Sequence, residues 1–128
     1  MIELIAIAVG GALGAVARFS LGQWVGDSLG TEFPWGILLI NVIGSLAIGI
    51  LFVLLVEHEH LSSIYRSALM VGFLGAFTTF STFSLQTLAL IETGRFLEAL
   101  TYILASVVLS LGAVALGVFI TRQLTGEV

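Results

Sequence analysis

Four long apolar stretches, separated by short polar turns, are the feature that most constrains this chain. They cover about residues 2–22, 35–56, 66–91 and 98–121, and each approaches or exceeds the ~20 residues that a helix needs to cross a hydrocarbon core. Hydrophobic residues make up 59% of the 128 residues, whereas soluble domains contain roughly 45–50%. The pattern predicts an all-α integral membrane protein, with residues 1–128 forming a single domain of four transmembrane helices.

The start of the chain and its composition narrow the class further. The first stretch begins without a basic leader and contains Gly10, Gly11 and Gly14, so we expect a retained helix rather than a cleaved signal peptide. The absence of cysteine excludes disulfides, thiol catalysis and thiolate metal sites. A net charge of -4 gives no support to a nucleic-acid partner.

The four arginines are balanced between the two ends of the helices. The turns between the apolar stretches are short, so neighbouring helices should be antiparallel. Arg66 and Arg122 then lie on one side of the membrane, and Arg18 and Arg95 lie toward the other. Because the loops carry no bias in positive charge, the chain has no strong instruction for one orientation. We therefore predict dual topology and an antiparallel homodimer, which is also the smallest plausible pore-forming unit.

The third stretch mixes glycines, hydroxyls and phenylalanines between Gly72 and Ser84. A helix could open at Gly75 to Thr79 and release carbonyl oxygens, which predicts a broken third helix. Such carbonyls, at Gly75 and Thr78, could hold a cation. The positive edges of the Phe80 and Phe83 rings could hold a small anion. The simpler alternative for the two rings is contact with the core or with lipid.

Polar residues in the other stretches admit two interpretations each. Asn41 is either an interhelical hydrogen-bonding group or a ligand group on a polar track. Tyr102, Ser106 and Ser110 stack along one helix face at a spacing of four residues, but serines in membrane helices often bond to their own i-4 carbonyl. Arg18 either extends to the interface or concentrates anions at a pore mouth.

The turn His58-Glu59-His60 is the one sequence that suggests a protein-ligated metal. Two histidines in a turn lack further ligands at helical spacing, so a solvated loop is the preferred interpretation.

Taken together, these residues resemble the small bacterial fluoride channels of the Fluc (CrcB) family across the whole chain. Three motifs carry the resemblance: Gly10-Gly11-Ala12-Leu13-Gly14-Ala15-Val16-Ala17-Arg18-Phe19, Asn41-Val42-Ile43-Gly44-Ser45, and the run from Gly72 to Ser84. The resemblance implies an antiparallel, dual-topology homodimer in the bacterial cytoplasmic (inner) membrane. It also implies two fluoride pathways and a structural sodium ion between the subunits.

The resemblance also implies a role for individual residues. Asn41, Phe80, Phe83, Ser81, Thr82, Tyr102, Ser106 and Ser110 match the family's fluoride pathway. The backbone carbonyls of Gly75 and Thr78 match its sodium ligands, and Arg18 matches an arginine near the aqueous vestibule. Some relatives carry an acid at the position of Gln86, so the sequence gives Gln86 no assigned role beyond facing the pathway.

The implied function is passive, fluoride-selective export that protects the cell from fluoride. Three rival functions are an antiporter of the small multidrug-resistance type, a scaffold subunit that transports nothing, and an intramembrane enzyme. Proton coupling needs a carboxylate within the membrane, but every acidic residue falls at a segment end or in a turn. No serine lies near a plausible base at membrane depth. A scaffold would leave Asn41 and the phenylalanine pair without a task.

Overall fold

The computed structural model describes residues 1–58 and 61–126, and every regular element within these ranges is helical. Four of the described helical spans are long and apolar enough to cross a membrane: Ile2–Leu29, Trp35–Glu57, Ser63–Glu92 and Phe96–Thr125. The prediction of four membrane-spanning helices is therefore confirmed. Residues 59 and 60 of the predicted histidine turn lie outside the described residues.

The first and last helices are longer than the apolar stretches that predicted them. Helix α1 (Ile2–Leu29) continues past residue 22 and ends at Gly30, whose φ of +84° suits glycine. Helix α6 (Phe96–Thr125) also ends at a glycine of positive φ, Gly126, which has the left-handed conformation with φ +81° and ψ 16°. The apolar stretches mark the thickness of the hydrocarbon region, whereas these helices continue until a glycine ends them.

The second span is a continuous helix, and the third is assembled from several pieces. Helix α2 (Trp35–Phe52) passes directly into a π-helical turn, η1 (Val53–Glu57). The third span begins as α3 (Ser63–Arg66) and widens into a π-helical segment, η2 (Ser67–Leu74). It then runs through the short helix α4 (Gly75–Phe77) and restarts as α5 (Phe80–Glu92).

Only two residues of the third span, Thr78 and Thr79, have an extended backbone. Thr78 has φ -79° and ψ 154°, and Thr79 has φ -151° and ψ 118°. The sequence-based expectation of an opening over Gly75 to Thr79 was too wide, because Gly75 itself has helical torsions. Within the chain a Cβ atom at Gly75 would meet only the Met70 carbonyl oxygen, at 3.8 Å, so neither its backbone conformation nor its surroundings require a glycine.

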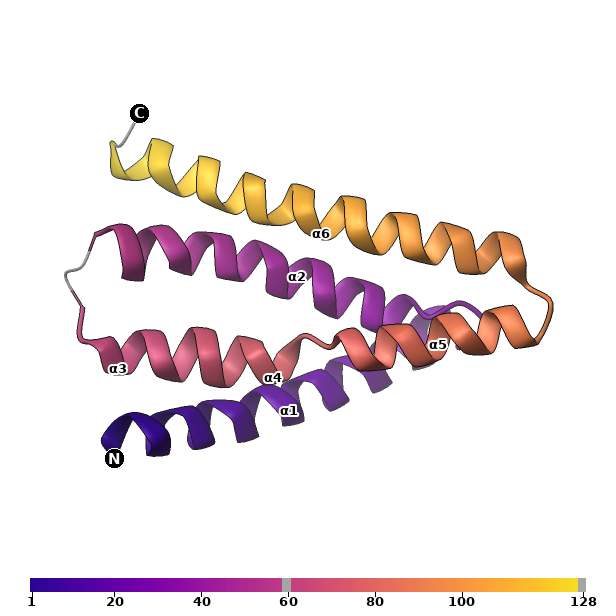
Figure 1. Cartoon of the computed structure of the whole chain (residues 1–128), viewed down its shortest axis with the longest axis horizontal. Helices are drawn as coiled ribbons and strands as arrows, with labels where there is room; N and C mark the ends of the chain where they lie inside the picture. Colours follow the sequence, from indigo (N-terminus) through magenta and orange to yellow (C-terminus); the bar gives the residue numbers. More distant parts are fainter. Residues whose placement is uncertain (59–60, 127–128) are drawn as a thin grey trace.

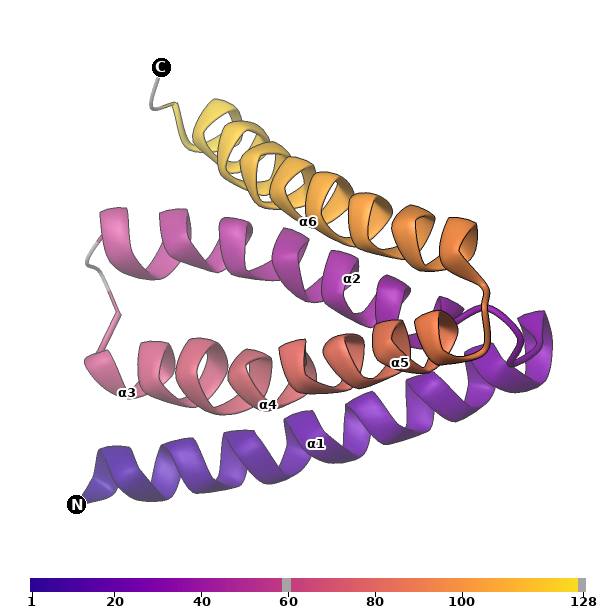
Figure 2. The ribbon, with the colours of Figure 1, turned by 45° about the vertical axis from the view of Figure 1, so that its right-hand side comes forward.

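The spans lie side by side and alternate in direction, with both ends of the chain at the same end of the bundle (Figure 1). Figure 2 shows the third span between α1 and α2, and α6 on the other side of α2. The most extensive packing joins α2 with α6 and α1 with η2. This arrangement places the interruption at Thr78 and Thr79 midway along the bundle.

Glycines allow these two helix pairs to approach closely. A Cβ atom at Gly10 or Gly14 would lie 2.1 Å from the carbonyl oxygen of Ala68 or Phe73, both in η2. A Cβ atom at Gly49 or Gly117 would lie 2.5 or 2.6 Å from a carbonyl oxygen of the facing helix. Small residues four positions apart, such as Gly10 and Gly14, therefore bring helix backbones together.

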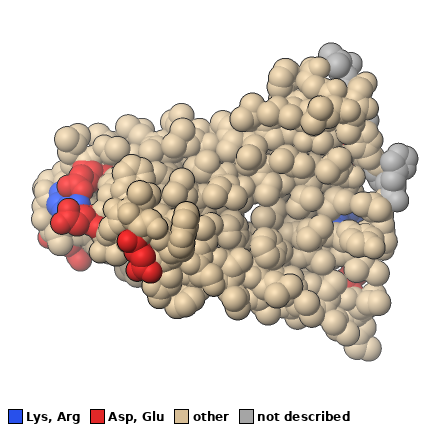
Figure 3. All heavy atoms as spheres, turned by 180° about the vertical axis from the view of Figure 1, so that it is seen from behind, with Lys and Arg blue, Asp and Glu red and all other residues tan. Residues whose placement is uncertain are grey.

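Among the described residues, most charged groups lie toward the two ends of the bundle, and Arg18, which reaches the Thr78 carbonyl, is the exception. Figure 3 shows acidic residues around a basic group at one end and a largely uncharged middle on that face. Arg95 and Glu98 pair at the start of α6, and this carboxylate raises the pKa of the Arg95 guanidinium. At the opposite end, Arg122 pairs with Glu57. The uncharged middle suits the hydrocarbon region.

Candidate functional site

The side chain of Asn41 holds the interruption in the third span. The Thr79 backbone N–H donates to Asn41 Oδ1 at 2.8 Å, and Asn41 Nδ2 donates to the Thr79 carbonyl oxygen at 3.1 Å. Asn41 thus provides both a donor and an acceptor for the extended backbone of Thr79. Of the two interpretations of Asn41, the interhelical hydrogen-bonding role is what the structure displays, and the second N–H of the amide is left for another acceptor.

Three hydroxyls gather at the start of α5. Thr79 Oγ1 accepts from the Thr82 backbone N–H at 3.2 Å, which makes it the helix cap. The same hydroxyl donates to Thr82 Oγ1 at 3.0 Å and lies 3.3 Å from Ser81 Oγ. Because Thr79 spends its single proton on Thr82, Ser81 must be the donor in the third contact. The hydroxyl of Thr82 therefore keeps its own proton for a further acceptor.

The interruption frees two backbone carbonyls from the bonds that a continuous helix would give them. The N–H of Thr79, which would otherwise donate to Gly75, donates to Asn41. The N–H of Thr82, which would otherwise donate to Thr78, donates to Thr79 Oγ1. Arg18 Nη1 lies 3.5 Å from the Thr78 carbonyl oxygen. Carbonyl oxygens are the hard donors that an alkali cation prefers. The Gly75 carbonyl therefore fits the sodium ion expected from the resemblance, whereas the Thr78 carbonyl fits it only when Arg18 gives up this hydrogen bond.

A groove of about 500 Å³ runs beside the interruption and collects most of the predicted site residues. Phe80 and Phe83 lie in it with ring centroids 5.4 Å apart and a tilt of 53°. Phe80 is 78% exposed, whereas Phe83 is buried. The remaining predicted residues along the groove are Asn41, Gly75, Thr78, Ser106 and Ser110.

Ser106 is the least satisfied polar group in this groove. Its Oγ is enclosed and has no hydrogen-bond partner among the described residues. The alternative that this serine bonds to its own i-4 carbonyl is therefore not what the structure shows. Most buried hydroxyls have a hydrogen-bond partner, so the unpartnered Ser106 hydroxyl stands out among the polar groups of this region. Ser106 thus combines a position beside the groove with a hydroxyl proton that no described group accepts.

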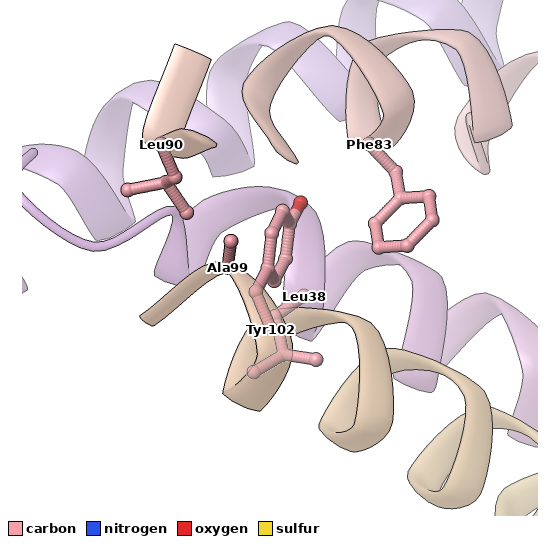
Figure 4. Packing of buried hydrophobic residues seen from close by; sticks show 5 residues of the cluster. All are labelled: Leu38, Phe83, Leu90, Ala99 and Tyr102. Carbon is pink, nitrogen blue, oxygen red and sulfur yellow. The ribbon is translucent and has the colours of Figure 1, made fainter. Parts of the chain in front are cut away.

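Tyr102 lies in a hydrophobic cluster that also contains Phe83, Leu38, Leu90 and Ala99 (Figure 4). It is fully buried, and its ring meets Phe83 and Phe33 edge-on at centroid distances of 5.0 and 5.6 Å. Its hydroxyl donates to Gln86 Oε1 at 2.8 Å. Trp35 extends the row of rings by contacting Phe33 at 4.7 Å. These contacts fix the orientation of the tyrosine.

A second cavity, of about 640 Å³, opens near the acidic end of the bundle. Arg18, Thr82 and Gln86 line it, together with the carboxylates of Asp27 and Glu32. The predicted vestibule residue Arg18 and the predicted pathway residue Thr82 therefore share this cavity, not the groove. Ser81 is exposed at the surface.

Sequence reasoning did not identify two residues that organise this region. Thr79 is a hub of the hydrogen bonds at the interruption, and its position inside the hydroxyl run was the available signal. Phe33 packs on Tyr102 from the connection between α1 and α2. A phenylalanine in a turn gave no signal of its own, because its neighbour on α6 is far away in the sequence.

Comparison with known proteins gives the family. The family model described as CrcB-like protein, Camphor Resistance (CrcB), matches residues 5–118. This chain belongs to that family. A fluoride-specific ion channel FluC of Hahella chejuensis is 50% identical over 120 residues, which cover 94% of each chain. A FluC of Hydrogenovibrio crunogenus is 46% identical over 96% of this chain and 93% of its own length.

Another relative in the same family is longer. The fluoride-specific ion channel FluC of Methylococcus capsulatus is 51% identical over 128 residues, but the match covers 56% of its length. The four-helix unit described here thus corresponds to a little more than half of that relative.

Proposed function

We propose that this protein is a fluoride-selective channel through which fluoride leaves the cell passively. The observation that carries the proposal is the enclosed, unpartnered hydroxyl of Ser106 in a groove that also contains the rings of Phe80 and Phe83. A neutral O–H donor and positive ring edges are suitable partners for a small, strongly hydrated anion. Relatives named as fluoride-specific channels support the same ion.

Neutral donors suit conduction better than charged ones. A channel must replace the hydration shell of its ion and still let the ion leave, which favours several weak sites in series. Ser110 lies one turn beyond Ser106 along the groove, and the free N–H of Asn41 lies at the same groove. We infer that fluoride passes between such donors, with selectivity over chloride set by the width of the passage.

The placement of the acids favours a channel over a proton-coupled antiporter. The six described acidic residues lie in end turns or connections of the helical spans: Glu3, Asp27, Glu32, Glu57, Glu92 and Glu98. A proton-coupled carrier needs a titratable carboxylate at membrane depth. The described part of the chain offers none there, so fluoride would move down its gradient. We propose no enzymatic activity.

The working unit that we propose is an antiparallel homodimer of chains inserted in both orientations. The groove is open along one side of the single chain, and the large ring of Phe80 is 78% exposed there. A second, inverted copy would cover this face and convert each groove into an enclosed path. The balance of Arg66 and Arg122 against Arg18 and Arg95 allows the two orientations that such a dimer requires.

We further propose that the third span acts as a broken membrane helix and that a sodium ion joins the two subunits at its interruption. The carbonyl oxygens of Gly75 and Thr78 would hold it from both copies. Gly75 is exposed, and both residues line the open groove. A bound sodium ion would supply positive charge and fix the two interruptions against each other. The chain's own part is to keep these carbonyls free of helical hydrogen bonds.

The proposed location is the cytoplasmic membrane of a bacterium. In a bacterium with two membranes this is the inner membrane. Neutral hydrogen fluoride enters a cell from weakly acidic surroundings and dissociates inside. A passive exit for the trapped anion would then protect the cell.

Fluoride efflux from liposomes that contain the purified protein tests the function. Fluoride should leave when its charge is compensated by an ionophore for potassium, and chloride loaded in the same way should stay. A protein that releases both ions equally, or releases fluoride only with an imposed proton gradient, would contradict the proposed function.

A further inference from the structure

The hydrogen bond between Tyr102 and Gln86 changes what each residue can offer an anion. A phenol carries one proton, and the Tyr102 hydroxyl donates it to Gln86 Oε1 at 2.8 Å. Figure 4 shows this hydroxyl pointing from α6 toward α5. In this arrangement Tyr102 has no proton left for an anion. In this arrangement the tyrosine expected on the pathway would act through Gln86.

Packing holds Tyr102 in this position. The residue is fully buried between Leu38 and Ala99, and it meets the rings of Phe83 and Phe33 edge-on. A ring enclosed in this way cannot turn its hydroxyl elsewhere without disturbing the cluster. The Oε1 atom of Gln86 thus accepts a hydrogen bond from a hydroxyl whose position is fixed by packing.

The hydrogen bond from Tyr102 also fixes the orientation of the NH₂ group of the Gln86 amide. With Oε1 engaged by Tyr102, the two N–H donors of Nε2 are the available part of this side chain. Gln86 lines the cavity of about 640 Å³, and so does Thr82, which lies four residues earlier on α5. Residues four apart share one face of a helix. Since Thr82 accepts from Thr79 and keeps its own proton, α5 presents hydroxyl and amide donors to the same cavity.

Charges around this cavity explain why a fixed neutral donor is useful there. Arg18 and Arg95 line it, but so do Asp27 and Glu32. Their opposing fields leave little net attraction for an anion. A preoriented amide binds an anion through its dipole without the strong hold of a full charge.

We propose that Gln86 is an anion-binding donor in the cavity of about 640 Å³, and that Tyr102 is its positioning residue. This inference rests on the proposed fluoride conduction and assigns the residue that first removes water from the ion. The oriented group is the Nε2 amide of Gln86, held by a buried tyrosine through its Oε1.

The test compares fluoride currents of four variants with those of the wild-type protein in planar bilayers at a series of fluoride concentrations. Gln86→Met keeps the size of the side chain and removes its amide. Tyr102→Phe keeps the ring and removes the hydroxyl. The double variant combines both changes. Gln23→Met is the matched control, because Gln23 is an exposed glutamine on α1 that lines the same cavity.

Gln86→Met should reduce the current at low fluoride about tenfold, since one hydrogen bond to a charged group is lost. The loss should shrink as fluoride rises, because it is a loss of binding. Tyr102→Phe should reduce the current less, and it should have no further effect in the double variant, because the hydroxyl acts only through Gln86. Gln23→Met should match the wild type.

Two results would overturn the inference. One is a wild-type concentration dependence in Gln86→Met. The other is a Tyr102→Phe effect of equal size with and without Gln86, which would make the tyrosine hydroxyl a direct ligand. Gln86→Leu repeats the test with a second apolar side chain, so that poor folding of one variant does not decide it. A wild-type protein without fluoride current would instead refute the proposed function.

Discussion

Asn41 and Thr79 form a two-point contact between α2 and the third span, in which one side chain satisfies both the N–H and the carbonyl of one backbone residue. The contact replaces the helical hydrogen bonds that the extended backbone of Thr79 cannot make. It therefore links a lone amide in an apolar helix to the geometry of the interruption.

Replacing Asn41 should open this contact. In Asn41→Asp the side chain still accepts from the Thr79 N–H, but a second oxygen faces the Thr79 carbonyl and repels it. Loss of one buried partner costs about 1–3 kcal/mol of unfolding free energy. We expect lower fluoride flux and an earlier unfolding transition in detergent. Asn41→Ala, which removes both hydrogen bonds without adding repulsion, is the comparison. Fluoride flux equal to that of the wild type in Asn41→Asp would contradict the role of Asn41 in holding Thr79.

Gly44 provides the space that the interruption occupies beside α2. A Cβ atom at Gly44 would lie 2.3 Å from Thr78 Cγ2. Turning the threonine away would break its bond from Oγ1 to the Leu74 carbonyl, which is 2.9 Å long. Gly44→Ala should therefore displace Thr78, lower fluoride flux and reduce the free energy of unfolding by about 1–3 kcal/mol through overpacking.

Gly112→Ala is the control for that change. It is also a glycine-to-alanine substitution in a membrane helix, but a Cβ atom there would meet nothing within 4 Å. Flux through Gly112→Ala should equal that of the wild type. Equal loss in both variants would mean that helix glycines matter in general and that contact with Thr78 does not.

Much of the fold could be predicted from the sequence, because a membrane helix is recognised from its own residues alone. Twenty apolar residues in a row identify each span without any knowledge of its neighbours. The ends of α1 and α6 were less accessible, since they depend on Gly30 and Gly126 rather than on hydrophobicity. The two π-helical segments had no signal in the sequence, because they depend on packing against other helices.

The candidate site was predictable as a set of residues but not as a set of contacts. Hydroxyls and an amide at membrane depth were visible in the sequence. Which atoms they bind is decided between spans, as in the pairs of Asn41 with Thr79 and of Tyr102 with Gln86. For the same reason Thr82 and Ser106, both expected on one pathway, line different cavities.

The aromatic pair offers a test of ring edges as anion partners. Phe80→Ile and Phe83→Ile keep bulk in the groove and remove the positive ring edge. We expect each to reduce fluoride flux in liposomes. Phe83→Ile should also lower stability, because Phe83 is buried against Tyr102 at 5.0 Å, whereas Phe80 is mostly exposed in the single chain. Unchanged flux in both variants would remove the rings from the mechanism.

The even distribution of the four arginines predicts that removing one of them changes the orientation in which the chain inserts into the membrane. Arg122→Gln leaves one arginine on its side of the membrane against two on the other, and Arg95→Gln creates the opposite bias. Each variant alone should insert mainly one way and give little fluoride export in cells. Co-expression of the two should restore export, because it supplies both orientations. Full activity of each variant alone would contradict the antiparallel dimer.

A sodium ion between the subunits predicts a stability that depends on sodium. A ligand that binds only the assembled protein raises its melting temperature as its concentration rises. The purified protein should therefore melt at a higher temperature in sodium chloride than in the chloride salt of a large organic cation at equal ionic strength. Identical melting curves in the two salts would contradict the assignment of Gly75 and Thr78.

The central claim is that this chain forms a passive path for fluoride ions, and the reversal potential of its current tests that claim most directly. Currents are recorded in a planar bilayer with unequal fluoride and equal chloride on the two sides, with and without a pH difference. The current should reverse at the equilibrium potential of fluoride. This reversal potential should stay the same when the pH difference is imposed. A reversal potential that follows chloride or the proton gradient, or the absence of any fluoride current, would contradict it.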